Sequence, residues 1–168
     1  MNRKLEFYVG PTNSGKTYNA MKKLKEANSG LYLAPLRLLA LEGYEDLKES
    51  NIEASLITGE EQQLSEDAAH ICSTIEMLDF DLEVDVAVID EVQMLEDNDR
   101  GWAWVNAIIG VPAKKVIMTG SVNALEAVKR IVQYLDEELE VVRHKRKNPL
   151  LVLEKWTPLE KLENGTAL

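Results

Sequence analysis

The sequence predicts a layered α/β domain in which a mostly parallel sheet is covered by helices on both faces. Short apolar, β-branched and aromatic runs alternate along the chain with stretches whose apolar positions recur at helical spacing. The strand-like runs show no strict alternation of apolar and polar residues, which is typical of parallel strands buried on both faces. A glycine-rich loop at 10–17 joins the first such run to the first helical stretch. Together these three observations predict the fold class.

The first half of the chain gives the elements in a regular order. A strand is expected at 5–9 (LEFYV), and a helix at 15–28 opens directly from the glycine-rich loop. The run GLYLAP predicts a strand at 30–35, and RLLALEGYEDLKES has the 3.6-residue apolar spacing of a helix at 37–50. A further strand follows at 53–58 (EASLIT).

The second half repeats the pattern. Strands are expected at 70–74 (HICST) and 86–90 (VAVID), and the helical stretch GWAWVNAIIG follows at 101–110. Another strand at 115–120 (KVIMTG) leads to a helix at 123–135 (NALEAVKRIVQYL). Strands separated by helices in this way indicate parallel crossover units.

The end of the chain is less regular. A strand is expected at 139–144 (LEVVRH), and the stretch 143–156 (RHKRKNPLLVLEKW) predicts the end of that strand, a basic turn and one more strand. The polar residues 157–168 resemble a linker or an edge segment.

The bulk composition is that of a soluble globular protein. The 168 residues suit one domain with a real core, and no apolar run approaches the roughly 20 residues that a membrane helix needs. The only cysteine, Cys72, excludes an internal disulfide and a multi-cysteine zinc site. Because a strand is expected almost at the N-terminus, we expect no signal peptide and a reducing, bacterial-type cytoplasm, although a trimmed protein of the mitochondrial matrix would look the same.

Charge is spread unevenly along the chain. The net charge is −10, of which residues 41–100 contribute −17 while residues 1–40 contribute +5. Phosphate contacts dominate nucleic-acid affinity, so an acidic middle argues against nucleic-acid binding over the whole surface. It does not exclude a local binding groove.

The loop GPTNSGKT fits the G-x-x-x-x-G-K-[ST] phosphate-loop pattern in full, between a strand and a helix. Gly10 and Gly15 allow the backbone N–H groups to converge on phosphates, and the helix N-terminus favours negative charge. Lys16 would place its ammonium on the β- and γ-phosphates, and Thr17 would offer its hydroxyl to Mg²⁺. The expected nucleotide-binding residues are Gly10, Pro11, Thr12, Asn13, Ser14, Gly15, Lys16 and Thr17.

Two adjacent carboxylates end the apolar run 86–89, in the stretch DVAVIDEVQM. An ionised pair at the end of a buried strand needs solvent, cations or hydrogen-bond donors. In phosphate-loop folds a second strand ends in an acid that holds Mg²⁺. We therefore expect Asp90 to hold the metal, with Thr17, and Glu91 to act as general base toward water.

Together with the phosphate loop, the stretches APLRLLALEGYE, TGEE, CSTIEM, DEVQ and RGWAWVNAIIG closely resemble the first RecA-like domain of the mitochondrial degradosome RNA helicase family, in the DExH group of superfamily 2. The likeness runs from about residue 5 to residue 155. It implies a RecA-like nucleotide-binding domain over 1–155, with 156–168 as a linker or the start of a second RecA-like domain.

The resemblance also implies roles for individual residues. DEVQ looks like motif II, so the catalytic set would be Lys16, Asp90, Glu91 and Gln93, with Gln93 coupling the γ-phosphate to domain closure. Thr119–Ser121 (TGS) occupies the position of motif III, although it departs from the family's usual sequence there. The resemblance places on nucleic acid the residues Pro35, Leu36, Arg37, Thr58, Gly59, Thr74 and Glu76.

The implied activity is ATP-dependent RNA unwinding with ATP and Mg²⁺ as cofactors. The expected partners are single-stranded or partly duplex RNA, with DNA not excluded, and a second RecA-like domain that supplies an arginine finger; the resemblance also allows a ribonuclease partner. Because such an arginine contributes about 10³–10⁵ to turnover, this chain alone should be weakly active. No membrane partner is expected.

Two other functions fit parts of the sequence. A nucleoside kinase of the thymidine kinase type also pairs a phosphate loop with a DE-x-Q strand end, but such enzymes usually carry a four-cysteine zinc lobe. A non-catalytic nucleotide sensor would need Lys16 but not Glu91. The tryptophans Trp102 and Trp104 could stack on bases, but in a helix after the acidic pair both are expected to pack against the sheet.

Overall fold

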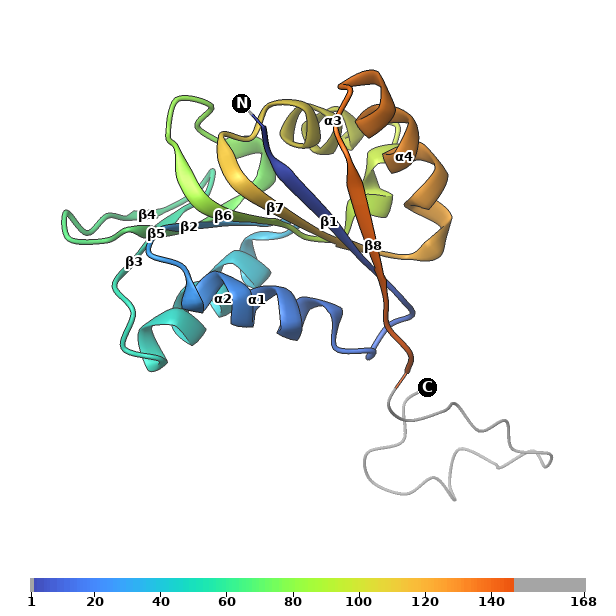
Figure 1. Ribbon diagram of the computed structural model, residues 1–168. Helices are drawn as coiled ribbons and strands as arrows, with labels where there is room; N and C mark the ends of the chain where they lie inside the picture. The colour runs from blue at the N-terminus through green and yellow to red at the C-terminus, as the bar shows by residue number, and fades with distance from the viewer. Residues whose placement is uncertain (1, 147–168) are drawn as a thin grey trace, which may run out of the picture.

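The central feature of the molecule is a single eight-stranded sheet with helices on both faces (Figure 1), as described for residues 2–146 by a computed structural model. The strands lie in the order β4-β3-β5-β2-β6-β7-β1-β8. They are β1 Lys4–Val9, β2 Gly30–Ala34, β3 Ala54–Ile57, β4 Gln62–Gln63, β5 His70–Thr74, β6 Val84–Ile89, β7 Ala113–Gly120 and β8 Leu139–Arg143.

Every pairing in the sheet is parallel except the short pair of β3 with β4. The central register aligns Tyr32 of β2 with Val88 of β6, and Ile89 of β6 with Met118 of β7. Parallel strands bring their carboxyl ends to one edge of a sheet, where open α/β sheets bind ligands. The loops after β1, β2, β6 and β7 therefore lie at the same edge.

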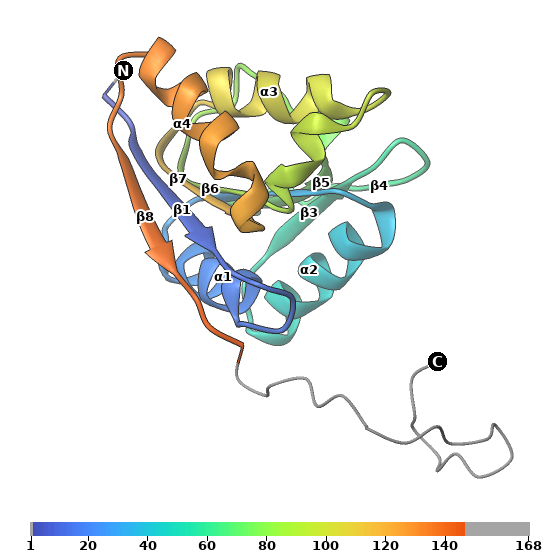
Figure 2. The ribbon, with the colours of Figure 1, turned by 90° about the vertical axis from the view of Figure 1, so that its right-hand side faces the viewer.

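Two pairs of helices cover the sheet, one pair on each face (Figures 1 and 2). Helices α1 (Lys16–Glu26) and α2 (Arg37–Glu49) lie on one face, and α3 (Gly101–Gly110) and α4 (Leu125–Tyr134) on the other. Short 3₁₀ helices occur at Ile75–Met77 (η1), Val92–Glu96 (η2) and Val122–Ala124 (η3). Each face has its own buried apolar cluster, the larger one including Trp104 of α3. The expected α/β architecture is confirmed.

Every expected strand and helix within the described residues is present, with ends that differ from prediction by no more than two residues. The two-residue strand β4 was not expected, because exposed Gln62 and Gln63 carry no apolar pattern. The further strand within 143–156 and the linker at 156–168 fall beyond residue 146 and so lie outside the described residues. No helix between residues 2 and 146 is long and apolar enough to cross a membrane.

The prediction for the two tryptophans is half right. Trp104 is fully buried against the sheet, whereas Trp102, two residues earlier on α3, is 56% exposed. A helix turns about 100° per residue, so residues two apart point to nearly opposite sides and cannot both face the sheet. The expectation that Trp102 packs in the core is wrong.

Candidate active site

The site lies at the carboxyl edge of the sheet, where three adjacent strands end. The phosphate loop follows β1, Thr119 and Gly120 end β7, and the acidic pair follows β6. Since β7 lies between β1 and β6, its last residues separate the loop from the acids and can contact both. Residues that lie far apart in the sequence are thus brought to one place.

The phosphate loop has the curled backbone that its sequence predicts. Asn13 and Gly15 have positive φ values of 61° and 85°, and Gly15 is the N-cap of α1. The Lys16 ammonium is buried and donates to the carbonyl oxygens of Gly10 (2.7 Å) and Pro11 (3.3 Å). A cavity of about 240 Å³ opens here, lined by residues 12–18 and by Glu91. A curled loop, an ammonium and a helix N-terminus around one cavity fit a bound phosphate chain.

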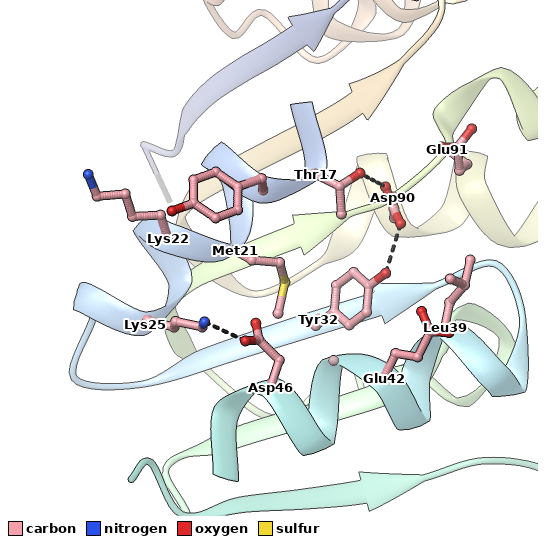
Figure 3. Close-up of a pocket in the computed structure, with 12 residues that line it drawn as sticks. Thr17, Met21, Lys22, Lys25, Tyr32, Leu39, Glu42, Asp46, Asp90 and Glu91 are labelled. Carbon is pink, nitrogen blue, oxygen red and sulfur yellow. Dashed lines mark hydrogen bonds and ion pairs between the residues drawn. The ribbon is translucent and has the colours of Figure 1, made fainter. Parts of the chain in front are cut away.

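Asp90 is the most tightly held acid of the site and is only 2% exposed. Its Oδ1 accepts hydrogen bonds from the hydroxyls of Thr17 (3.1 Å) and Thr119, and its Oδ2 accepts one from Tyr32 (2.8 Å; Figure 3). The indole of Trp104 donates to the Asp90 backbone carbonyl at 2.9 Å. Three hydroxyl donors within the protein therefore satisfy the oxygens of this buried carboxylate.

The oxygens of Thr17 and Asp90 fit a divalent cation. Mg²⁺ prefers hard oxygen ligands and is usually bound through one or two protein groups together with substrate phosphates. The threonine hydroxyl and the carboxylate are 3.1 Å apart beside the phosphate-loop cavity. This pair can therefore hold Mg²⁺ at the end of a bound phosphate chain.

Glu91 has an unusual backbone conformation, with φ 56° and ψ 52° in the left-handed region. Its backbone N–H donates to the Thr119 hydroxyl at 3.2 Å, and its carboxylate accepts a hydrogen bond from the Gln93 side chain. Left-handed glutamate is costly and is found where the surrounding structure enforces it, commonly at functional sites. Glu91 lines the phosphate-loop cavity, where a base for water would be needed.

The end of β7 contacts both motif-II acids. The Thr119 hydroxyl bonds to the Asp90 carboxylate and to the Glu91 N–H, and the Ser121 N–H donates to Gln93 Oε1 at 3.3 Å. A shift of Thr119–Ser121 would therefore move Asp90, Glu91 and Gln93 together.

A second, larger cavity of about 590 Å³ lies between α1 and α2, behind Thr17 and Asp90 (Figure 3). Tyr32 and Met21 line it, an ion pair between Lys25 and Asp46 (2.7 Å) crosses it, and Asp90 lies at its far end. Burial above all, and then the Asp90 carboxylate, raise the pKa of Tyr32 well above its usual range, so this hydroxyl remains a donor. Sequence reasoning missed Tyr32, because a tyrosine in a strand is most simply a core residue.

The residues expected to bind nucleic acid also gather at the carboxyl edge, on the neighbouring strands β2, β5 and β3. Pro35, Leu36 and Arg37 follow β2; Thr58 and Gly59 follow β3; Thr74 ends β5 and Glu76 lies in η1. They form a row beside the acidic pair. The structure therefore brings them together but does not by itself assign them a ligand.

Three side chains of this row, those of Arg37, Thr58 and Glu76, already have protein partners. Arg37 forms ion pairs with Glu60 (2.6 Å) and Glu61 (2.7 Å), and the Thr58 hydroxyl is buried in the turn that leads to Glu61. Arg100, which sequence reasoning missed, bonds to Glu76 and to the Pro35 carbonyl at 2.6 Å. An RNA phosphate would have to compete with the two glutamates for Arg37.

Comparison with known proteins gives a consistent family. The model of the DEXQ-box helicase domain of Suv3 matches residues 1–144. The mitochondrial ATP-dependent RNA helicase SUV3 homolog of Caenorhabditis elegans is 43% identical over 157 residues, covering 91% of this chain and 22% of its own length. The mitochondrial ATP-dependent RNA helicase SUPV3L1 of Homo sapiens is 42% identical over 168 residues, covering 98% and 21%. The chain thus spans about a fifth of the length of these relatives.

A solved structure supports the fold. The helicase domain of Pyrococcus furiosus Hef superposes with a TM-score of 0.59 at 23% identity, over 84% of this chain and 35% of that one. These helicase matches do not support the thymidine kinase alternative. The expectation of a bacterial-type cytoplasm is wrong, because the relatives are named mitochondrial helicases.

Proposed function

Because the chain belongs to the family of the DEXQ-box helicase domain of Suv3, we propose that it is the ATP-binding domain of an ATP-dependent RNA helicase and that it hydrolyses ATP at the site described above. The observation that carries the proposal is the hydrogen bond of 3.1 Å between Thr17 of the phosphate loop and Asp90. It joins two segments that are 73 residues apart in the sequence. Nucleotide hydrolysis in phosphate-loop proteins needs such a hydroxyl and such a carboxylate side by side. On the names of the relatives we also propose a mitochondrial location.

The geometry of the site supports the following proposed roles. The backbone of residues 10–17 would bind the phosphate chain, and the Lys16 ammonium would turn from the loop carbonyls to the β- and γ-phosphates. Thr17 and Asp90 would hold Mg²⁺, which neutralises charge on the β- and γ-phosphate oxygens. The buried position of Asp90 keeps this carboxylate in place before substrate arrives.

Glu91 would act on water. A water oxygen attacks the γ-phosphorus, its proton passes to the Glu91 carboxylate, and the bond from the γ-phosphorus to the bridging oxygen breaks to give ADP and phosphate. The hydrogen bond from Gln93 orients the Glu91 carboxylate. Through Ser121, Gln93 also contacts the end of β7, so the loss of the γ-phosphate can be transmitted to the strand edge.

The nucleic-acid site is proposed along the carboxyl edge. Arg37, Thr58 and Thr74 would contact the RNA backbone, and the remaining members of the row would be Pro35, Leu36, Gly59 and Glu76. Backbone contacts position a strand without reading its sequence, so this domain would bind RNA of any sequence. A second RecA-like domain would close over the same edge and supply an arginine finger; a ribonuclease partner remains a prediction from the resemblance alone.

The test is ATP turnover with and without single-stranded RNA, using the wild-type chain and Glu91→Gln, with thymidine as a control substrate. We expect nucleotide binding with slow hydrolysis that is lost in Glu91→Gln. Transfer of phosphate to thymidine, or the absence of any nucleotide binding, would overturn the proposal.

A further inference from the structure

Tyr32 contacts the metal-binding acid from the side opposite the phosphate loop. We propose that Tyr32 is a positioning residue that holds the Asp90 carboxylate in its metal-binding orientation, an inference that rests on the proposed function. The Tyr32 ring is 3% exposed, and its hydroxyl donates to Asp90 Oδ2 at 2.8 Å. Figure 3 shows the ring standing between α1 and α2 with its hydroxyl directed at Asp90.

The two oxygens of Asp90 are held from opposite sides. Oδ1 accepts from Thr17 and Thr119, whereas Tyr32 is the only donor to Oδ2 among the described residues. Since Thr17 is itself assigned to the metal, Thr119 and Tyr32 are the donors that remain on the carboxylate. Without Tyr32, one hydroxyl on one oxygen would leave the carboxylate free to rotate about its Cβ–Cγ bond.

The packing around the ring is arranged for this contact. Gly43 lies in the interior of α2, where glycine is less favourable than alanine. A Cβ at this position would lie 2.6 Å and 2.8 Å from two carbon atoms of the Tyr32 ring. The glycine lets α2 lie close to the Tyr32 ring, and in this position the ring's hydroxyl reaches Asp90.

A simpler reading is that Tyr32 is a core tyrosine whose buried hydroxyl needs a partner. Tyr8 offers a matched comparison, because it is also buried and its hydroxyl donates to a carboxylate, that of Glu6, at 3.2 Å. Glu6 lies within β1, away from the carboxyl edge. Removal of either hydroxyl disturbs a buried tyrosine–carboxylate pair, but only Tyr32 contacts the metal-binding acid.

The experiment measures the affinity of the 168-residue chain for a fluorescent ATP analogue as a function of Mg²⁺ concentration, together with the thermal unfolding of each variant without Mg²⁺. Mg²⁺ should increase the affinity for the analogue, and we expect Tyr32→Phe to raise the Mg²⁺ concentration that gives half of this increase about tenfold or more. This is the usual effect of removing a group that orients a metal ligand. In EDTA, without free Mg²⁺, the affinity of Tyr32→Phe for the analogue should stay within about twofold of wild type. Tyr8→Phe should leave the Mg²⁺ response unchanged.

Gly43→Ala gives an independent test, since it displaces the ring of Tyr32 but does not remove the hydroxyl group. It should weaken the Mg²⁺ response in the wild-type background and have no further effect on that response in Tyr32→Phe. A wild-type Mg²⁺ response in Tyr32→Phe, whatever its unfolding temperature, overturns the positioning role. A wild-type chain whose ATP affinity does not respond to Mg²⁺ overturns the proposed metal site, and the role of Tyr32 with it, so the two failures are distinguishable.

Discussion

Glu91 is the residue whose backbone most clearly marks the site. Among residues 2–146, positive φ outside glycine occurs at Asn13, Asn51, Glu91 and Asp136. Asparagine and aspartate tolerate this region because their short side chains bond to the local backbone, whereas glutamate gains no such compensation. At Glu91 the hydrogen bond from its N–H to Thr119 and the bond from Gln93 hold the strained conformation. We interpret this strain as the cost of directing a base at the phosphate cavity.

At this scale the first prediction concerns Glu91→Gln. Glutamine keeps the shape of the side chain but cannot accept a proton from water, so hydrolysis should fall by about 10²–10⁴ while ATP affinity is unchanged. Single-turnover hydrolysis and a nucleotide titration measure the two quantities. Glu96→Gln, at an exposed position of η2, is the control and should behave as wild type. Equal hydrolysis in Glu91→Gln and wild type would remove Glu91 from the mechanism.

A second residue-scale prediction concerns Arg37→Gln. If Arg37 contacts one RNA phosphate, its loss should weaken binding to all sequences alike and reduce the slope of log affinity against log salt by about 0.7. Binding of fluorescent single-stranded RNA at several salt concentrations checks this. Lys114→Gln is a matched control, because Lys114 is an exposed cation paired with Asp85 near the amino end of β7. An unchanged slope in Arg37→Gln would place RNA elsewhere.

The glutamates that pair with Arg37 should have the opposite effect. The hydrogen bond from Arg37, above all, lowers the pKa of Glu61, which favours the ionised form of this carboxyl group. Glu60→Gln combined with Glu61→Gln should release Arg37 and raise RNA affinity severalfold in the same assay, by the loss of like charge near the phosphate. Weaker RNA binding in this double variant would mean that the glutamates orient Arg37 instead of competing for it.

At the scale of elements, the junction of β1 with β7 carries a charge network around the buried carboxylate of Glu6. Glu6 of β1 accepts from Lys115 of β7 at 3.0 Å, and Lys4 lies 3.4 Å from the same carboxylate. Burial alone would raise the pKa of Glu6, but the hydrogen bonds and charges of Lys115, with Tyr8 and Lys4, outweigh it and lower the pKa below 4.5. A lowered carboxyl pKa stabilises the fold above the ordinary pKa, and this stability is lost as pH falls through the folded value.

The prediction is that Lys115→Met destabilises the domain at pH 7 by about 1–3 kcal/mol, the value of a hydrogen bond to a charged group. The difference from wild type should shrink as the pH falls below about 4.5, because protonated Glu6 no longer needs the ammonium. Urea unfolding at several pH values measures it. Lys129→Met, in an exposed pair with Glu126 on α4, should change stability by less than about 0.5 kcal/mol. A Lys115→Met difference that does not vary with pH would contradict this account.

The elements themselves could be predicted because their patterns are local. Apolar runs ended by polar residues located each of the longer strands, and the phosphate-loop motif located the start of α1. The strand β4 could not be predicted, since two exposed glutamines form a strand only because β3 lies beside them. The exposure of Trp102 could have been predicted, since helical spacing allows only one of two tryptophans at i and i+2 to face the sheet.

Contacts between side chains of different elements could not be predicted from the sequence. The motifs predicted that Thr17 and Asp90 share one site. No sequence pattern predicts that Tyr32 donates a hydrogen bond to the Asp90 carboxylate or that Trp104 donates one to the Asp90 backbone carbonyl. These contacts depend on the order β2-β6-β7-β1, which alternation of strands and helices does not fix. Gly43 could have offered a signal, as a glycine in a helix interior requires a packing reason.

At the scale of the whole molecule, the acids, the phosphate loop and the row of residues proposed to contact RNA occupy one edge of the sheet. The chain spans about a fifth of the length of its curated relatives. We predict that a longer protein carrying a second RecA-like domain has an RNA-stimulated turnover about 10³–10⁵ above that of this chain, because the partner domain would supply the proposed arginine finger. Steady-state phosphate release compares the two, with Lys16→Ala in the longer protein as the inactive control. Equal turnover would mean that this domain completes its own site.

The central claim is that residues 10–17 and the acidic pair form an ATP·Mg²⁺ site. Calorimetric titration of the chain with ATP and Mg²⁺ tests it most directly, with Lys16→Ala compared with Lys23→Ala, a lysine on the exposed side of the same helix. We expect wild type and Lys23→Ala to bind ATP alike and Lys16→Ala to lose at least about tenfold in affinity, in keeping with the loss of a charged hydrogen-bond donor. Equal ATP affinity in all three would contradict it.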